Sequence, residues 1–508
     1  MRYPRAAGIL LHPTSLPGPY GIGGIGEAAY QFIDFLVESG QTLWQILPLG
    51  PTGYGDSPYQ CFSALAGNPF LINLDWLAAE GDLDPAELAS APSFPEGWVD
   101  YGPVISFKTA MLHRAARRFQ EHATPQRRAD FEQFCAEEAG WLEDFALFMA
   151  LKESHGGAVW NTWEWELASR QPEALALWRE RLAEAVHAHR YFQYCFDRQW
   201  AKLKRYAAER GIKIIGDIPI FVAFDSVDVW AHPEFFMLDE NRLPTVVAGV
   251  PPDYFSPTGQ LWGNPIYDWK ALEKQGYTWW INRVKQTLRA VDIIRFDHFR
   301  GFEAYWEVPA GEPTAINGKW KKGPGLKFFN ALKAALGDLP LIAEDLGFIT
   351  PEVAALRKAL DLPGMKILQF AFATDAANAY LPHNYDPNYA VYTGTHDNDT
   401  TMGWYWKVGK EERQMTQQYL GPVGEPMNWA LIRLAYQSVA DLAIVPLQDV
   451  FGLGSEGRMN TPAKPSGNWS WRFKSEALQP EYKARLRNLA LTYGRKEPEV
   501  KKAMPSYM

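Results

Sequence analysis

Eight short apolar runs recur along the chain, and most of them are separated by stretches with helical spacing of apolar residues. Strands buried on both faces of a parallel sheet have this near-continuous apolar character. The alternation of strand and helix therefore predicts an α/β fold, and a count of eight favours a closed parallel (β/α)8 barrel over a doubly wound open sheet. The runs cover residues 6–11, 43–47, 212–221, 291–294, 341–347, 365–372, 390–398 and 442–450.

Two intervals between these runs are much longer than a barrel needs. Residues 51–205, after the second run, hold helical patterns at 105–122, 126–154 and 172–210. Residues 222–290, after the third run, contain a loop at 247–256 that is rich in Pro and Gly. We expect one barrel domain over residues 1–508, with a largely helical subdomain inserted at 51–205 and a second insertion at 222–290.

Ionisable residues lie at the ends of three runs. The run at 291–294 is followed by Arg295, Asp297 and His298, whereas Glu344 ends the fifth run and Asp397 the seventh. Polar side chains at the carboxyl ends of barrel strands form active sites, although an ion pair that caps a strand is the simpler reading. Strands four and five are neighbours, so Asp297 and Glu344 are expected to face each other. Two facing carboxylates can cleave glycosides; a carboxylate metal site is the rival.

Aromatic residues are abundant, with 21 Trp, 23 Tyr and 28 Phe. Flat rings with a polar edge suit the binding of sugars, although a Trp-rich core would also account for many of them. No H-E-x-x-H motif or histidine cluster indicates a transition metal. The composition therefore favours a carbohydrate ligand and predicts no metal.

Other ligand classes and locations are disfavoured by charge and by motif context. The net charge is −9 with no basic stripe, which argues against nucleic acid and anionic membranes as partners. The G-I-G-G-I-G run at 21–26 lacks the strand directly before it and the acidic residue about 20 positions later that a dinucleotide site requires. Three widely spaced cysteines form no disulfide framework, residues 6–11 are too short for a signal peptide, and no run approaches a membrane span, so we expect a cytoplasmic protein.

Several segments carry a family resemblance. R-F-D-H-F, A-E-D-L-G, G-T-H-D-N-D-T and G-D-I-P-I-F resemble the signature regions of the α-amylase clan. L-H-P-T-S-L-P, G-P-T-G-Y-G-D-S-P-Y-Q, A-G-V-P-P-D-Y-F-S and S-G-N-W-S-W-R closely match amylomaltases, the bacterial 4-α-glucanotransferases. The match runs from about residue 4 to 471. It implies a (β/α)8 barrel without the C-terminal β-domain of ordinary amylases.

The resemblance also implies roles for individual residues. Asp297 would be the nucleophile, Glu344 the acid/base, and Asp397 the residue that stabilises the transition state. Arg295 would keep the nucleophile ionised. The implied substrate contacts are Tyr59, Asp217, Trp262, Asn264, His298, His396 and Asn468, with Tyr254 and Phe255 on a mobile loop and Tyr54 and Tyr101 in a secondary glucan groove. Family members place an acid directly after F-A-F, where this chain has Ala373, so Asp375 receives no role.

The predicted function is therefore the transfer of α-1,4-glucan segments between maltooligosaccharides or starch-like glucans by a retaining double displacement. This chemistry requires no redox cofactor and no metal, and nothing indicates an obligate protein partner. Two alternatives remain open: an amylase-type hydrolase and a non-catalytic glucan-binding protein. The second is disfavoured because a binding protein needs the aromatic residues but not all three acids.

Overall fold

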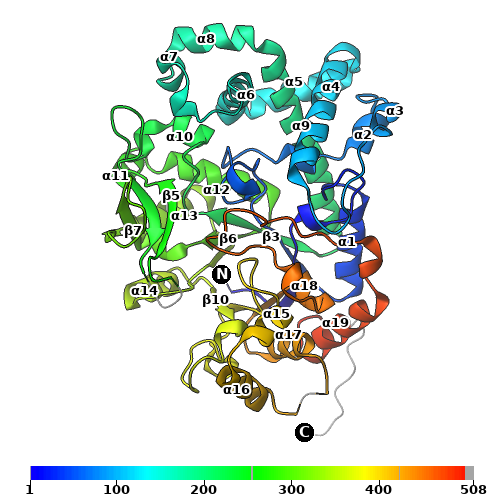
Figure 1. Cartoon of the computed structure of the whole chain (residues 1–508), viewed down its shortest axis with the longest axis vertical. Helices are drawn as coiled ribbons and strands as arrows, with labels where there is room; N and C mark the ends of the chain where they lie inside the picture. Colours follow the sequence, from blue (N-terminus) through cyan, green and yellow to red (C-terminus); the bar gives the residue numbers. More distant parts are fainter. Residues whose placement is uncertain (1, 253–255, 423, 498–508) are drawn as a thin grey trace.

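A computed structural model describes residues 2–252, 256–422 and 424–497. Eight parallel strands form one sheet in the order β10-β11-β12-β1-β2-β3-β6-β9, which confirms the predicted barrel (Figure 1). The strands are β1 (Ala6–Leu10), β2 (Leu43–Gln45), β3 (Lys213–Pro219), β6 (Ile293–Asp297), β9 (Leu341–Ala343), β10 (Gly364–Ile367), β11 (Tyr389–Tyr392) and β12 (Leu442–Pro446).

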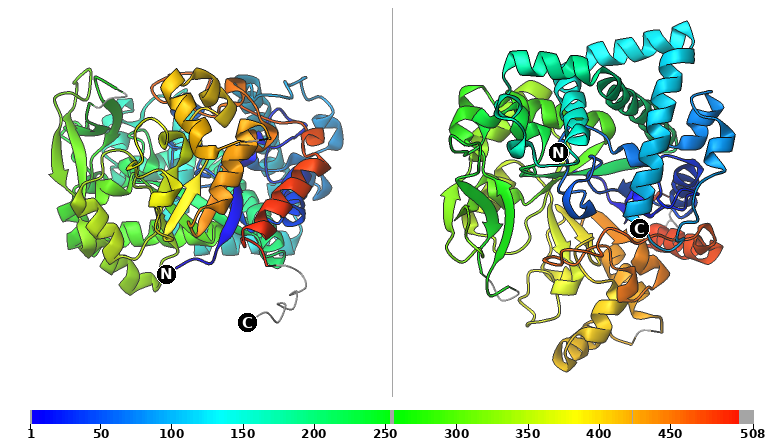
Figure 2. Two further views of the ribbon diagram at one scale, coloured as in Figure 1. Left: turned by 90° about the horizontal axis from the view of Figure 1, so that it is seen from below. Right: turned by 45° about the horizontal axis from the view of Figure 1, so that its top comes forward.

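The first and last strands in this order also meet, so the sheet curves into a nearly closed barrel. The Ala343 amide, at the end of β9, donates to the Pro363 carbonyl just before β10, with an N···O distance of 2.9 Å. On the other side, β12 pairs with β1 in parallel register, and the two strands lie side by side in orange and blue in Figure 2. An open doubly wound sheet is therefore excluded.

Several strands are shorter than the apolar runs that predict them. β9 ends at Ala343, so Glu344 lies in the loop that follows, and Asp397 lies five residues beyond the end of β11. The run at 365–372 turns into a 3-10 helix at Leu368–Phe370, and the run at 442–450 becomes helix α18 (Leu447–Phe451). In each case the chain remains buried after it leaves the sheet, so apolar character persists where the strand has ended.

Helices surround the barrel. In α1 (Glu27–Glu38) the buried side chains include Ala29, Phe32, Ile33 and Leu36, at three- and four-residue spacing, which gives the helix one apolar face. The chain reverses just after this helix at Gly40, whose φ of +73° favours glycine. Further helices in the barrel sequence are α12 (Thr278–Ala290), α13 (Gly325–Leu336), α14 (Pro351–Ala359), α15 (Thr401–Lys407), α16 (Lys410–Leu420), α17 (Met427–Gln437) and α19 (Pro480–Thr492).

Helices dominate the chain between β2 and β3, at the top of Figure 1. Two of the helices expected there are each broken into two. The predicted 126–154 helix breaks at Glu138, whose carboxylate accepts hydrogen bonds from Trp141 Nε1 at 2.6 Å and from Gln286 Nε2 at 2.8 Å, on α12. The 172–210 helix breaks at Leu182, and no contact explains that break. The elements are α2 (Leu74–Ala79), α3 (Pro85–Leu88), α4 (Tyr101–His122), α5 (Pro125–Glu137), α6 (Ala139–Ser154), α7 (Trp165–Ala168), α8 (Pro172–Arg181) and α9 (Ala183–Glu209).

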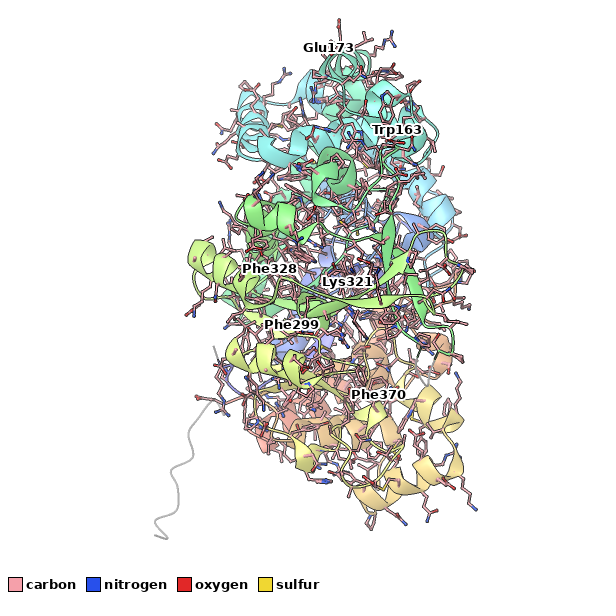
Figure 3. The ribbon with its side chains drawn as sticks, turned by 90° about the vertical axis from the view of Figure 1, so that its left-hand side faces the viewer. Trp163, Glu173, Phe299, Lys321, Phe328 and Phe370 are labelled. Atoms are coloured by element: carbon pink, nitrogen blue, oxygen red, sulfur yellow. The ribbon has the colours of Figure 1, made fainter. Side chains whose placement is uncertain are left out.

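A second, antiparallel sheet is absent from the sequence prediction. Its strand order is β5-β4-β7-β8. Strands β4 (Val246–Val250) and β5 (Gln260–Pro265) come from the insertion after β3, whereas β7 (Ala304–Pro309) and β8 (Lys319–Lys322) follow β6. Short helices α10 (Val227–Ala231) and α11 (Trp269–Lys274) flank the first pair. Figure 3 views this side of the molecule, with Lys321 of β8 marked.

No helix in the described ranges is both long enough and apolar enough to cross a membrane.

Candidate active site

The centre of the site is an ion-pair network on adjacent strands. Arg295 and Asp297 are two residues apart on β6, so their side chains share one face of the strand. Arg295 Nη1 lies 2.6 Å from Asp217 Oδ2 on β3 and 2.8 Å from Asp297 Oδ1. Tyr59 donates its hydroxyl to the same Asp217 oxygen at 2.8 Å. Burial opposes the charge of Arg295, but Asp217 and Asp297 outweigh it and raise its pKa, so a fixed cation lies beside Asp297.

Glu344 is held on the other side of Asp297. Its Oε2 accepts a hydrogen bond from the His298 amide at 2.6 Å, and its Oε1 accepts one from the Leu346 amide at 2.8 Å. Burial and the nearby charge of Asp297 raise its pKa to about 7, against the opposing effects of Arg295 and the two amides. A carboxyl group with this pKa can both give and take a proton near neutrality, as a general acid/base must.

Asp397 has the opposite electrostatic environment. Burial raises its pKa, but His396, whose Nε2 lies 3.3 Å from Oδ2, and Asn460, which donates to Oδ1 at 2.6 Å, outweigh burial and lower the pKa to about 2. Arg458 fixes the backbone by donating to the Asp397 carbonyl at 2.6 Å. Asp397 is therefore an anion over the whole neutral range.

Aromatic rings line two sides of these carboxylates. The Tyr59 ring stacks on His396, with centroids 5.1 Å apart and planes at 19°, and Trp469 packs against both rings. On the other side, Trp262 meets His298 edge-on at 4.8 Å. His298 has left-handed backbone angles, with φ of 51°, which turn the chain sharply directly after Asp297.

Two buried imidazole nitrogens lack a hydrogen-bond partner within the described part of the chain. They are His298 Nε2 and His396 Nδ1. Buried polar atoms are normally paired, so an unpaired atom at a site marks a position for a ligand or water to bind. Both atoms are placed where a sugar hydroxyl could bind them.

The amide groups of two predicted substrate contacts are engaged within the protein. Asn264 Nδ2 donates to the Val222 carbonyl at 2.8 Å. Asn468 accepts a hydrogen bond from the Thr461 amide at 2.9 Å and donates to the Lys464 carbonyl at 2.8 Å, so this side chain closes its own loop. A contact with substrate would therefore use what hydrogen-bonding capacity these amides have left.

The outer predicted residues have varied positions. Tyr54 is 80% exposed, whereas Tyr101 is half-buried and donates its hydroxyl to the Trp469 carbonyl at 2.8 Å. Tyr254 and Phe255 lie outside the described residues. Asp375 is an exposed loop residue whose carboxylate accepts a hydrogen bond from a nearby backbone amide.

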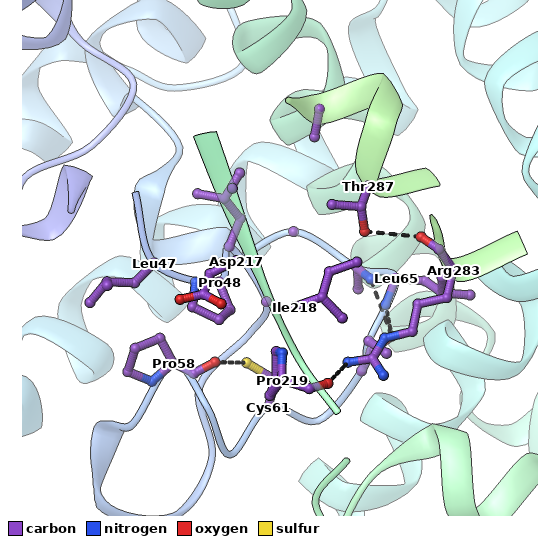
Figure 4. A pocket seen from close by; sticks show the side chains of 18 of the residues that line it. Leu47, Pro48, Pro58, Cys61, Leu65, Asp217, Ile218, Pro219, Arg283 and Thr287 are labelled. Carbon is purple, nitrogen blue, oxygen red and sulfur yellow. Dashed lines mark hydrogen bonds between the residues drawn. The ribbon is translucent and has the colours of Figure 1, made fainter. Parts of the chain in front are cut away.

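A small cavity lies behind the site. Its volume is about 110 Å³, with Tyr59 and Asp217 in its wall together with Arg283 and Cys61 (Figure 4). Arg283 donates to the Pro219 carbonyl at 2.7 Å, and the Cys61 thiol donates to the Pro58 carbonyl at 2.9 Å. These backbone contacts support the strand end that carries Asp217.

Metal binding finds no support in the described residues, where no group of three or more His, Cys, Asp or Glu side chains is arranged to hold an ion.

Three residues of the site are missing from the sequence prediction: Arg458, Asn460 and Trp469. Trp469 directly follows the predicted Asn468 and has φ of 62°. A bulky residue with positive φ stays buried at this position because its ring packs on Tyr59 and His396. The S-G-N-W-S-W-R motif contains the Trp, but no pattern in the sequence indicates Asn460.

Comparison with known proteins decides the family. The sequence pattern of the 4-alpha-glucanotransferase family matches residues 11–478. The chain is 54% identical to a 4-alpha-glucanotransferase of Thermus thermophilus, over 96% of this chain and 99% of the relative. The chain belongs to the 4-alpha-glucanotransferase family.

Other members agree with this assignment. A 4-alpha-glucanotransferase of Synechocystis sp. is 53% identical, over 97% of this chain and 98% of its own length. The amylomaltase from Streptococcus agalactiae, solved in complex with acarbose, superimposes with a TM-score of 0.94 at 41% identity, covering 97% of this chain and all of that one. The 4-alpha-glucanotransferase fold is thus shared over nearly the full chain.

Proposed function

We propose that this 4-alpha-glucanotransferase moves α-1,4-glucan segments between maltooligosaccharides or starch-like glucans by a retaining double displacement at Asp297, Glu344 and Asp397. One observation carries the assignment of roles. Within one site, the pKa of Glu344 is raised to about 7 and that of Asp397 is lowered to about 2. Carboxyl groups whose pKa values are pushed apart are suited to different roles, one as proton donor and one as anion.

In the first step, Asp297 attacks the anomeric carbon of the donor glucan. Glu344, protonated, gives its proton to the glycosidic oxygen, and the departing glucan leaves with a free 4-hydroxyl. Arg295, 2.8 Å from Asp297 Oδ1, favours the ionised nucleophile. The product is a covalent glucosyl-enzyme.

In the second step, ionised Glu344 takes the proton from the 4-hydroxyl of an acceptor glucan. The acceptor oxygen bonds to the anomeric carbon, the bond to Asp297 breaks, and two inversions give retention. Both steps pass through a positively charged transition state, which the anion of Asp397 stabilises.

Sugar binding is assigned to the residues around these acids. His298 Nε2 and His396 Nδ1 are proposed to bond sugar hydroxyls, with Tyr59 and Trp262 as flat walls. Asn264 and Asn468 are proposed to contact glucosyl units, with Asp217 in support. Tyr254 and Phe255 are proposed to cover the acceptor and exclude water, which a transferase must do if a sugar hydroxyl is to win over water.

Transfer and hydrolysis share the covalent intermediate, so the three acids do not separate them. Incubation with maltotriose is expected to give glucose and a ladder of longer oligosaccharides, while total reducing ends stay nearly constant. Long amylose should also give cyclic glucans, because its own 4-hydroxyl can act as acceptor. Reducing ends that rise in step with substrate loss, without longer products, would instead identify a hydrolase.

The roles of the acids are tested by substitution. Asp297→Asn, Glu344→Gln and Asp397→Asn should each lower turnover by on the order of 10³-fold or more, because the three groups act as a unit. Binding of maltooligosaccharides should largely survive, which also separates an enzyme from a binding protein. Near-full activity of any one variant would remove that residue from the mechanism.

Further expectations from the sequence remain proposals. These are the secondary glucan groove at Tyr54 and Tyr101, the division into one barrel with insertions at 51–205 and 222–290, a cytoplasmic location, and activity without cofactor or protein partner.

A further inference from the structure

The loop that follows Glu344 carries an unusually exposed aromatic ring. Phe348, four residues after Glu344, is 71% exposed. The loop leaves the carboxyl end of β9, so it lies on the same rim of the barrel as Asp297. A single exposed apolar side chain is common on protein surfaces and indicates nothing alone. The contacts that hold this loop are what distinguish Phe348.

The loop is fixed on both sides of Phe348. Before it, the Leu346 amide bonds Glu344 Oε1 at 2.8 Å, and the Asp345 carboxylate accepts from the Met365 amide at 2.7 Å on β10. At Phe348 itself, Arg300 donates a hydrogen bond to the backbone carbonyl. The exposed ring is therefore presented by a backbone that is tied to two neighbouring parts of the barrel.

Arg300 is a buried cation, 5% exposed, whose hydrogen bonds go to backbone carbonyls. Besides the bond to Phe348, its Nε donates to the Ala304 carbonyl at 3.4 Å, and its guanidinium carbon lies 3.7 Å from the centre of the Trp320 ring. Burial lowers the pKa of Arg300. Placing a charge in such surroundings is costly, and its effect here is to join the Phe348 loop to Trp320.

Trp320 adds a second partly exposed ring. It lies on β8, directly opposite Trp306 of β7, and the two indoles meet edge-on at 5.2 Å. Trp320 remains 37% exposed. Phe348 and Trp320 therefore flank a single guanidinium, and together they offer flat apolar surface next to the Glu344 loop.

We propose that Phe348 and Trp320 form an acceptor-side platform that binds glucosyl units of the incoming α-1,4-glucan. This inference rests on the proposed function. The acid that protonates the glycosidic oxygen faces the departing glucan, and the acceptor later takes the same place. The loop that starts at Glu344 therefore borders the acceptor chain rather than the donor sugar held by Asp297. Flat rings bind the apolar faces of glucosyl units.

The test measures acceptor use with amylose as donor and fluorescently labelled glucose or maltotetraose as acceptor. Phe348→Ala and Trp320→Ala should each raise the KM for maltotetraose about five- to tenfold, the loss expected for one aromatic contact. The KM for glucose, which is too short to reach the platform, should change less than twofold, and kcat should be retained. Trp165→Ala, at a 52% exposed Trp on α7, is the matched control and should leave both KM values unchanged.

Two results would overturn the platform. One is an unchanged maltotetraose KM in both variants, and the other is an equal loss with glucose and maltotetraose, which would indicate a general structural effect. Because the wild-type enzyme is assayed alongside, failure of the proposed function would be distinct: the wild type itself would then elongate no acceptor.

Discussion

Replacing Glu344 with Gln should change how the stability of the enzyme depends on pH. Burial and the charge of Asp297 raise the pKa of Glu344 from 4.5 to about 7 in the folded protein. That difference corresponds to about 3 kcal/mol in favour of the protonated form. The same environment that makes Glu344 a proton donor thus makes its ionised form destabilising.

The sign follows from comparing the two states. In the unfolded chain the carboxyl group ionises as pH rises above about 4.5, whereas in the folded chain it does so near 7. Between these values the folded state holds the proton more tightly, so raising the pH favours unfolding. Wild type should therefore lose up to about 3 kcal/mol from this group between pH 4.5 and pH 8, and Glu344→Gln should not.

A second effect of the substitution does not depend on pH. An amide has one oxygen, so Gln cannot accept hydrogen bonds from both the His298 and Leu346 amides. The loss of one such bond costs about 1–2 kcal/mol at every pH. The informative quantity is therefore the change in the difference between variant and wild type, rather than the difference at one pH.

Calorimetry at pH 5 and pH 8 measures this change. For a chain of this length the unfolding entropy is about 1 kcal/mol/K, so Glu344→Gln should gain about 2–3 °C in Tm relative to wild type on going from pH 5 to pH 8. Glu411→Gln, at an exposed residue of α16, is the control and should show no such gain. An equal Tm difference at both pH values would refute the reasoning that the environment of Glu344 penalises its charge.

Three further substitutions test the surroundings of the acids. Asn460→Ala removes a donor to Asp397 and should raise its pKa, so the acid limb of the pH–rate profile should move to higher pH. Trp262→Ala should weaken oligosaccharide use by ~1–3 kcal/mol with little change in Tm; a lower Tm with unchanged affinity would instead make it a core residue. Arg295→Gln leaves buried Asp217 unpaired and should destabilise the fold by about 3–5 kcal/mol in denaturant titrations, whereas adding Asp217→Asn should restore part of this loss.

The barrel follows from the sequence because buried parallel strands leave a direct apolar signature. The second sheet leaves none. β8 reads K-W-K-K and is fully exposed, and β5 reads Q-L-W-G-N-P, so neither has the alternation of a half-buried strand. Its pairing also joins segments that lie far apart in the chain, such as Val247 and Val308, and no local pattern records such a contact.

The candidate site divides in the same way. Asp297, Glu344 and Asp397 are found because they follow apolar runs, and their motifs add roles. Asn460 lies in a loop of Met, Thr and Pro that has no periodicity, and only the folded chain places its amide 2.6 Å from Asp397. The pKa values also require the structure, because burial and charge depend on neighbours in space.

The antiparallel sheet has a consequence for the order of folding. Its central pair, β4 and β7, comes from the segments after β3 and after β6, so it can align only once those two barrel strands are near each other. Contacts of such long sequence separation form late, because the chain between them must first be ordered. During refolding, helical circular dichroism should therefore recover before activity does, since Trp262 on β5 reaches His298 only in the last stage. A slow return of activity in an already helical chain would be an intrinsic property of this topology.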